Sequence, residues 1–407
     1  MTSRLRAHAP WTALGLVAVA GLAWLGLLGF VWTDYEAEAA PALAALVRGD
    51  VGGFLALCPA YGGSLIIRAP FALAASGLGG GELAVFRAVA VPCLLAGVAL
   101  GVVLAAQLAV RGRGRGECAV AVLLCAGNPI TLRALDMGHP EELLGGALCV
   151  GALLAALRGR GTLTAVLLGL ALANKAWAVL AVGPILLALP GQRVRTLAMA
   201  GAIAGALLLP LLLAGAPSVQ PGAASGAVTG TIFQPWQVWW ALGSPNELIV
   251  GSDNVVKEGY RLAPAWLSPI SHPLIIAVAL PLTLLAWRRR ADPLLLLSLL
   301  FLLRCILDPW NTAYYVLPAI LAVLAWEGLR FDRGPVVALA LTAATWVTWE
   351  WVPRYASPDA QAALYLVWSV PLALALAWRL YAPPVTWSLP APHRAAPDSA
   401  GGRASVF

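Results

Sequence analysis

Long apolar runs alternate with short polar breaks along nearly the whole chain. The first run extends from Trp11 to Val31, and similar runs follow as far as residue 381. A helix needs roughly 20 apolar residues to cross the ~30 Å hydrocarbon layer of a bilayer. The pattern therefore predicts an all-α polytopic membrane protein, a bundle of about 10–12 transmembrane helices. The expected spans are 11–32, 84–110, 118–134, 143–157, 196–215, 272–287, 294–307, 314–328, 335–352 and 360–381.

The segment 162–190 departs from this pattern. Arginines lie beyond both of its ends, so the chain must leave one side of the membrane and return to it. The segment is too short for two crossings of ~20 residues each. We therefore expect two short helices that meet near Asn174–Trp177. Lys175 would then lie at a turn within the membrane.

Composition supports the membrane assignment and narrows the partners. Hydrophobic residues make up 60% of the 407 residues and charged residues 11%, whereas a soluble domain has about 25% charged residues. The formal net charge of +7 arises mainly from arginines in the breaks between apolar runs. This distribution is typical of charges that orient a membrane protein and predicts no nucleic-acid partner. The main clusters lie at Arg4 and Arg6, Arg111–Arg115, Arg158 and Arg160, Arg193 and Arg195, Arg288–Arg290, Arg330 and Arg333, and in the C-terminal tail.

These clusters all fall on one side of the membrane if the spans are as given. We expect that side to be the cytoplasm and both termini to be cytoplasmic, with the protein in the cell membrane. The long connections 33–83 and 217–271 are then external, as are most of the 19 acidic residues. We expect one transmembrane domain over 1–383 and a disordered cytoplasmic tail over 384–407.

Several charged side chains fall in apolar segments too short to span the bilayer. A charge at mid-bilayer costs at least ~2.5–3.5 kcal/mol, so such residues are candidates for function. Structural alternatives remain open: His139 and the acids after it fit the start of a helix, Lys175 can reach the surface, and Arg304 can pair with Asp308 one turn later. The candidates are Arg133, His139, Glu141, Glu142, Lys175, Arg304, Asp308, Asn311, Tyr314 and Tyr315.

The first external connection opens with "WTDYEAEAAPALAALVRGD", in which Asp34, Glu36 and Glu38 follow the first span. A solvated loop is one interpretation, and a catalytic carboxylate at the membrane surface is the other. If the segment is helical, Glu38 lies on the same face as Asp34 and Glu36 does not. The stretch "PALAALVRGD" predicts an interfacial helix.

Cations beside an outward cavity are suited to a phosphate group, because arginine binds phosphate bidentately and lysine acts as a point charge. A phosphate in such a cavity implies a lipid carrier whose tail lies in the bilayer. The sequence has no glycine-rich nucleotide loop. His139 and Glu141 have metal-like spacing but no second histidine nearby, so we expect no metal site and no cofactor. The six cysteines have no metal-type spacing, and we expect them to serve packing.

The anchor with its acidic loop, followed by "GHPEELL", "LLGLALANKAWA" and "LRCILDPWNTAYYVLP", resembles the GT-C superfamily of integral-membrane glycosyltransferases. The nearest type is similar to the polyprenyl-phosphate-mannose-dependent mannosyltransferases, family 87 of the glycosyltransferases. The resemblance covers most of residues 10–330 and rests on motif order and topology. It implies that a carboxylate of the first external loop is the general base, and the matching position is Asp34, with Glu36 second.

The resulting expectation is transfer of a sugar, with mannose first, from a polyprenyl-phosphate donor to a lipid or glycan acceptor at the outer membrane face. A transporter or flippase for a polyprenyl-phosphate or glycolipid is the alternative. The donor phosphate is expected to meet Lys175, Arg304, Arg133 and His139. Substrate contacts are expected from Tyr35, Glu141, Glu142, Asp308, Asn311, Tyr314 and Tyr315, with membrane lipids as further partners.

Overall fold

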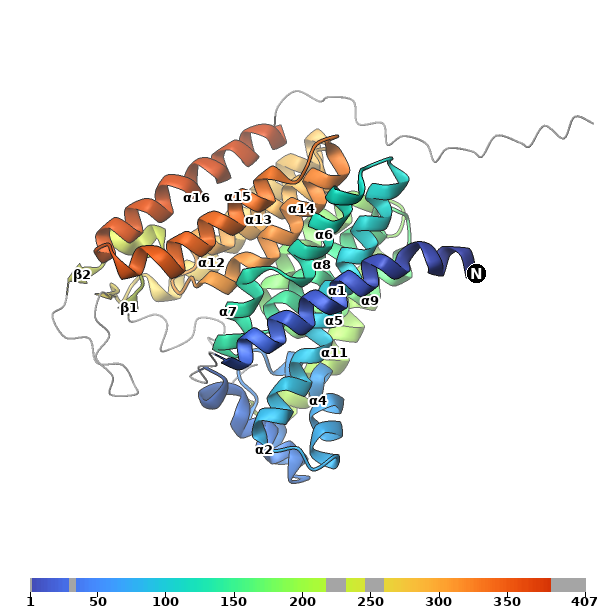
Figure 1. Cartoon of the computed structure of the whole chain (residues 1–407). Coiled ribbons are helices and arrows are strands. Elements are labelled where there is room, and N and C mark those ends of the chain that lie inside the picture. The colour runs from blue at the N-terminus through green and yellow to red at the C-terminus, as the bar shows by residue number, and fades with distance from the viewer. Residues whose placement is uncertain (1, 29–33, 217–231, 246–259, 382–407) are drawn as a thin grey trace, which may run out of the picture.

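The computed structural model describes residues 2–28, 34–216, 232–245 and 260–381, and these residues are mostly helical (Figure 1). Within them, eight helical stretches are long and apolar enough to cross a membrane. Three shorter apolar stretches, Gly161–Asn174, Ala176–Ala188 and Pro293–Leu307, accompany them. The described chain is thus an all-α protein with helices of the membrane-spanning kind. The predicted tail and part of the predicted connection 217–271 lie outside the described residues.

The predicted first connection, 33–83, is largely helical. After α1 (Thr2–Leu28) come a π-helical turn η1 (Tyr35–Ala39), α2 (Ala40–Val47), α3 (Val51–Leu57) and α4 (Gly62–Gly77). The helix predicted from "PALAALVRGD" is confirmed as α2. These elements share a small apolar core with Phe86 and Val89 of α5 (Glu82–Val110). This core holds the acidic segment against the rest of the bundle.

The predicted helix over 118–134 is interrupted. It consists of α6 (Arg115–Ala126) and α7 (Pro129–Met137), with a break at Asn128. The Asn128 side chain accepts a hydrogen bond from the Ile130 backbone N–H at 2.9 Å, and Pro129 follows as the first helical residue. A capping asparagine followed by proline starts a new helix.

The broken helix pair predicted around Lys175 is confirmed. After α8 (Glu141–Ala156), helix α9 (Gly161–Asn174) ends directly before Lys175, whose backbone is extended at φ −154° and ψ 140°. The chain resumes as the 3-10 turn η2 (Ala176–Ala181), continues as α10 (Val182–Ala188), and reaches α11 (Arg193–Leu213). Lys175 therefore lies at the point where two short helices meet.

The C-terminal half forms a second group of helices, drawn in yellow to red in Figure 1. They are α12 (Ser268–Arg289), α13 (Pro293–Leu307), η6 (Ala313–Val316), α14 (Leu317–Arg330), α15 (Val336–Trp346), η7 (Val347–Trp351), η8 (Val352–Arg354) and α16 (Pro358–Tyr381). A small antiparallel sheet and η5 (Val238–Leu242) precede α12. In it β3 (Arg261–Leu262) pairs on one side with β1 (Ile232–Phe233) and on the other with β2 (Ser244–Pro245).

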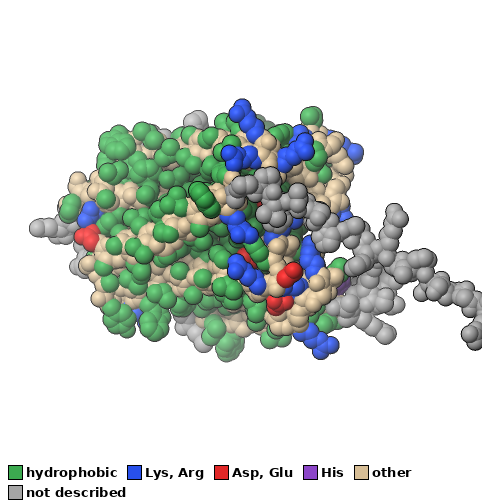
Figure 2. Space-filling model, turned by 90° about the horizontal axis from the view of Figure 1, so that it is seen from above, with side chains coloured by type: hydrophobic (Ala, Val, Ile, Leu, Met, Phe, Trp, Pro, Cys, Tyr) green, Lys and Arg blue, Asp and Glu red, His purple; other side chains and the backbone are tan. Residues whose placement is uncertain are grey.

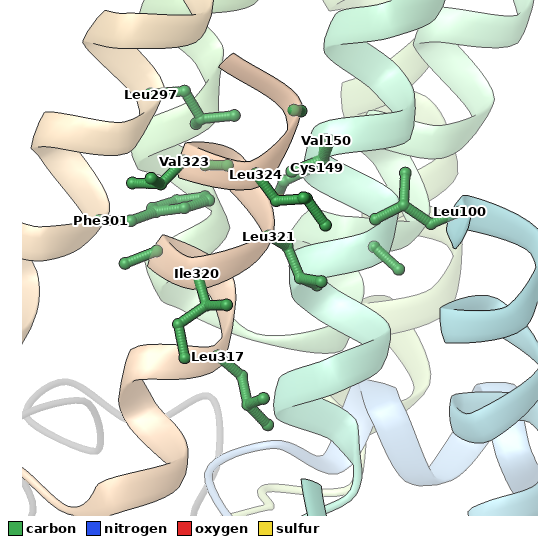
Figure 3. Close-up of a cluster of buried hydrophobic side chains, with 14 of the residues drawn as sticks. Leu100, Cys149, Val150, Leu297, Phe301, Leu317, Ile320, Leu321, Val323 and Leu324 are labelled. Atoms are coloured by element: carbon green, nitrogen blue, oxygen red, sulfur yellow. The ribbon is translucent and has the colours of Figure 1, made fainter. Parts of the chain in front are cut away.

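Helix α14 lies at the centre of the packing. Buried residues make up 89% of the apolar window in Ala313–Arg330, against 22% in His8–Gly26 of α1. Figure 3 shows α14 side chains between Phe301 of α13 and Cys149 of α8. Close packing and small residues, rather than apolar burial, hold helices together in lipid. At Gly97 of α5, for example, a Cβ atom would lie 2.6 Å from the Cys125 carbonyl oxygen.

Arginine-bearing helix ends gather at one end of the bundle, called here the basic end. Arg113, in the turn after α5, lies 4.0 Å from Asp332, in the turn after α14, which places these two turns side by side. Arg330 pairs with Asp292 at 2.7 Å, and Arg289 donates to the Tyr381 carbonyl at 2.7 Å. In the view from above, Lys and Arg side chains gather in one region of the visible surface, while hydrophobic side chains cover much of the rest (Figure 2).

Candidate functional site

The turn between α7 and α8 brings the first connection onto the bundle. Gly138 ends α7 in the left-handed conformation at φ 89°, which a residue with a side chain adopts only at a cost. A Cβ atom at this position would lie 2.6 Å from Cβ of Tyr35. Glycine therefore lets η1 approach the turn. That approach sets Asp34 beside His139.

His139 lies between carboxylates from two parts of the chain. Its Nε2 is 3.3 Å from Oδ2 of Asp34 and 3.9 Å from Oε2 of Glu38, and its Nδ1 is 2.8 Å from Oε1 of Glu141. Asp34 and Glu38 thus share a face, as the helical spacing predicts. The ring stacks on Tyr314 at 5.0 Å between ring centres.

These carboxylates control the charge of His139, which lies in a turn outside the membrane-spanning segments. Burial alone would lower the pKa of the imidazole, but Glu141 and Asp34 outweigh it and raise the pKa to about 9. His139 is therefore a cation at neutral pH and donates hydrogen bonds from both ring nitrogens.

Glu141 and Glu142 lie in the first turn of α8 with no exposed side-chain surface. Carboxylates are favourable at this end of a helix because of the backbone dipole. Lys175 bridges both, at 3.1 Å from Glu141 and 3.0 Å from Glu142. Arg68 of α4 lies 3.4 Å from Glu141. Each buried acid therefore has at least two cationic partners.

Arg304 of α13 binds Glu142 through two hydrogen bonds of 3.2 and 3.3 Å. Its guanidinium lies over the rings of Trp177 and Tyr315, at 4.6 and 4.4 Å. The Trp177 indole N–H also donates to Glu142 at 3.2 Å. Since only 4% of the Arg304 side chain is exposed, this arginine is enclosed by its partners. Asp308, the local partner that the helical spacing left open, is not within ion-pair distance of Arg304.

The residues of this charged cluster are Asp34, Glu38, Arg68, His139, Glu141, Glu142, Lys175 and Arg304. Four carboxylates and four cations offset one another. The inner members are buried, whereas the side chains of Asp34 and Glu38 are 33% and 44% exposed. The cluster therefore presents an acidic, accessible edge backed by a buried ionic network.

Two predicted site residues contact this cluster through their rings or hydroxyls. The Tyr314 hydroxyl is 3.5 Å from Oδ2 of Asp34, and Tyr315 stacks with Arg304. Glu36 is exposed, and in the described part of the chain no polar contact joins it to the cluster. Tyr35 is buried against Phe86, with ring centres 4.7 Å apart.

Three other predicted site residues lie in separate contacts. Arg133 pairs with Glu350 at 2.6 Å and lies 3.7 Å from Asp136. Asp308 accepts from the Trp310 backbone N–H at 2.8 Å, and the His272 ring is 3.9 Å away.

Asn311 donates to the Trp236 carbonyl at 2.9 Å and to the Tyr365 hydroxyl at 3.0 Å. These bonds connect the turn after α13 to the segment before α12, through Trp236, and to α16, through Tyr365. The structure thus brings His139, Glu141, Glu142, Lys175 and Arg304 together with Asp34, and leaves Arg133, Asp308 and Asn311 outside.

Sequence reasoning missed Arg68 and Asn174. Arg68 is an arginine inside the apolar stretch "YGGSLIIRAPFALAA", and the argument that selected Lys175 applies to it equally. Asn174 joins α9 to two other helices, because it accepts from Ser64 at 2.7 Å and donates to the Glu141 carbonyl at 3.0 Å. Nothing in the local sequence distinguishes it from a capping residue.

Within the residues that the structure describes, no group of three or more His, Cys, Asp and Glu side chains has the arrangement of a metal site. The six cysteines are free and buried. Comparisons of the chain with protein-family models, with curated proteins and with solved structures find no match.

Proposed function

We propose that this protein is an integral-membrane glycosyltransferase of GT-C type that uses a polyprenyl-phosphate sugar, with mannose as the first candidate. One observation carries the proposal: a partly exposed carboxylate, Asp34, sits at the edge of a buried ionic network, at the end of the bundle opposite the basic end. The same helices join the two ends. Helix α8 begins with Glu141 and reaches the basic end after 16 residues, a length of about 24 Å.

In the proposed reaction, a hydroxyl of the lipid or glycan acceptor attacks the anomeric carbon of the donor sugar. Its oxygen forms the new bond to that carbon, while the bond from carbon to the phosphate oxygen breaks. Asp34 takes the hydroxyl proton, and polyprenyl phosphate leaves with the bonding electron pair. His139 and Tyr314 orient the Asp34 carboxylate, since both lie within 3.5 Å of Oδ2.

The contacts refine the expected roles of the cations. The Arg304 guanidinium is enclosed by Glu142, Trp177 and Tyr315, and only 4% of its side chain is exposed. We assign Arg304 the task of fixing Glu142, and through it Lys175. The Lys175 side chain is 12% exposed, so Lys175 and His139 are the cations that the leaving phosphate meets. Tyr315 lies beside Lys175, with its ring centre 5.9 Å from Nζ.

The remaining substrate contacts belong to the same proposal. Glu141 and Glu142 belong to the charged cluster, and Tyr35 lies in the sequence between the two acids of its exposed edge. In the proposal these three residues form the part of the site that contacts the sugar. Asp308 and Asn311 fix the segment that carries Tyr314. Arg133 lies outside the charged cluster, and its ion pair with Glu350 gives it a positioning role for α7.

The test is sugar transfer by the purified full chain, supplied with radiolabelled polyprenyl-phosphate sugars and a membrane lipid extract. Asp34→Asn keeps the shape of the side chain and removes the base, so turnover should fall by roughly 10²–10⁴-fold. Donor binding should persist. Glu36→Gln is the matched control, because Glu36 is exposed on the same turn and should leave turnover unchanged. Equal activity in wild type and Asp34→Asn would remove the proposed base.

A flippase or transporter for a polyprenyl-phosphate lipid is the second candidate. The observation in its favour is the alternation of acids and cations that runs inward from the partly exposed Asp34 through His139, Glu141 and Lys175 to Glu142. Such chains are found in transporters that move protons or ions. Proteoliposomes separate the two: a flippase moves labelled lipid phosphate across the bilayer without releasing sugar, whereas a transferase gives a glycosylated product.

A further inference from the structure

The basic end contains a cavity that the proposed reaction does not use. Its volume is about 540 Å³, within the range of roughly 300–1,000 Å³ that small-molecule sites occupy. It lies where α8, α10, α11, α12 and α13 end or begin. Its walls include Leu157, Leu187, Trp287 and Pro293, with Arg193 and Arg290 as the charged members. None of its lining residues is acidic.

The two arginines are not neutralised by the described protein. Arg193 stacks on Trp287, with the guanidinium carbon 3.9 Å from the ring centre, and its Nε donates to the Leu186 carbonyl at 2.9 Å. In the described ranges, neither Arg193 nor Arg290 has a carboxylate within ion-pair distance. The nearby Asp292 is engaged by Arg330 through bonds of 2.7 and 3.1 Å. The cavity is therefore positively charged.

The backbone at Arg290 adds an independent observation. Arg290 is the one residue other than glycine with a positive φ among the described residues, at φ 51° and ψ 40°. The left-handed conformation costs a residue with a side chain roughly 1–2 kcal/mol, and glycine is the usual residue at such a helix end. The chain thus has an arginine where glycine would cost less free energy. We take this as a sign that the positive charge at this position has a role.

We propose that this cavity binds the phosphate headgroup of an anionic glycerophospholipid from the leaflet at the basic end. Two arginines can hold a phosphate with several hydrogen bonds. The apolar wall from Leu157 and Leu187 accommodates the start of an acyl chain. Trp287, 37% exposed, is of the type found at the boundary of lipid and water. Basic pockets between transmembrane helices on the cytoplasmic side bind anionic headgroups in this way.

Purified full chain in detergent tests the proposal, with bound lipid counted by native mass spectrometry. The probes are dioleoylphosphatidylglycerol and dioleoylphosphatidylcholine, with inorganic phosphate as competitor. Each arginine should contribute about 1 kcal/mol of binding free energy to an anionic lipid. Together the two predict a preference for phosphatidylglycerol over phosphatidylcholine on the order of 30-fold. Arg193→Gln combined with Arg290→Gln should reduce the preference to below about threefold. Leu157→Phe keeps both charges, narrows the cavity and should also weaken binding.

Arg195→Gln is the matched control. Arg195 is an exposed arginine in the same first turn of α11 and does not line the cavity, so its variant should keep the full preference. Absence of a preference in wild type overturns the proposal. An equal loss in Arg195→Gln, or no loss in the double variant, assigns the effect to general surface charge and overturns the site. Displacement of the lipid by inorganic phosphate at equal concentration assigns the cavity to a free anion and overturns its assignment to lipid.

Discussion

Arginines at the two ends of the bundle have opposite surroundings. In the charged cluster, Arg68 and Arg304 each lie within 3.4 Å of a buried carboxylate. At the basic end, Arg193 and Arg290 line an open cavity, and no described carboxylate pairs with either. A cation that is paired and enclosed inside a protein cannot lose its partner without a large loss of stability. A cation without a protein partner, beside a cavity, retains its capacity to bind a ligand.

The two ends of the bundle are expected to differ most in the side of the membrane that they face. The end with the charged cluster should face outward, and the basic end should face the cytoplasm. Cysteine at Ala37, in η1, should be labelled from outside the cell, and cysteine at Gly116, in the first turn of α6, only from the cytoplasm. The native protein should give little labelling of its own, because all six native cysteines are buried. Gly116 has open space around its Cβ position. Labelling of Gly116→Cys by an impermeant reagent in intact cells would reverse the orientation.

Glu142→Gln tests the paired end. The substitution leaves Arg304 buried without its carboxylate, which should destabilise the fold by ~3–5 kcal/mol. Thermal unfolding in detergent measures the loss. Arg290→Gln, at the other end, replaces an exposed side chain and should change stability by less than ~0.5 kcal/mol. The combination Glu142→Gln with Arg304→Met should recover much of the loss, because no uncompensated charge remains. Equal small effects at both ends would contradict the difference between the paired and the unpaired arginines.

The pH dependence of stability should distinguish the ends as well. The His139 pKa is about 9 in the folded chain against an ordinary 6.5. The protonated ring therefore stabilises the fold fully below pH 6.5, and this contribution is lost as the pH rises through about 9. Its size should be a few kcal/mol. The groups that face the ring are Asp34, Glu38, Glu141, Lys175, Tyr61 and Tyr314.

Unfolding curves between pH 6 and pH 10 measure this loss. His139→Gln should flatten the profile in this window, and His272→Gln, outside the cluster, should leave it as in wild type. Lipid binding at the basic end should stay constant from pH 6 to pH 9, because arginine remains charged throughout. A wild-type slope that survives in His139→Gln would assign the titration to another group.

The smallest expected effect is at Arg290. Arg290→Gly removes the strain of the left-handed backbone and should stabilise the fold by about 0.5–1 kcal/mol. The same variant should lose part of the lipid preference. Arg288→Gly, in the last turn of the same helix, should instead destabilise by up to ~1 kcal/mol. Thermal unfolding compares the pair, and the same sign for both would contradict the backbone argument.

Local and topological signals in the sequence were sufficient for much of the fold. Arginines at both ends of 162–190 predicted the break at Lys175, and helical spacing placed Glu38 rather than Glu36 beside Asp34. The partner of Arg304 could not be predicted. Asp308 is the local choice four residues away, whereas the structure pairs Arg304 with Glu142, 162 residues distant. Helix packing decides between such partners, and packing is not encoded in local spacing.

The turn at Gly138 illustrates a second kind of limit. A single glycine before "HPEE" predicts the end of a helix, but not which distant segment approaches it. The contact with Tyr35 depends on the absence of a Cβ atom, and it is this contact that brings Asp34 to His139. Sequence reasoning identified both residues separately as candidates.

The spread of the charged cluster along the chain has a consequence for biosynthesis. Its members lie at the start of η1 and within it, on α4, on the turn before α8, on α8, after α9 and on α13. Translation delivers Arg68 before Glu141, then Lys175, and Arg304 long after them. A nascent chain that has not yet reached α13 can offer Glu142 one of its two cations, Lys175, but not Arg304. The ribosome must therefore complete residue 304 before the last buried charge finds its counterpart, and N-terminal fragments that stop earlier should be retained by quality control.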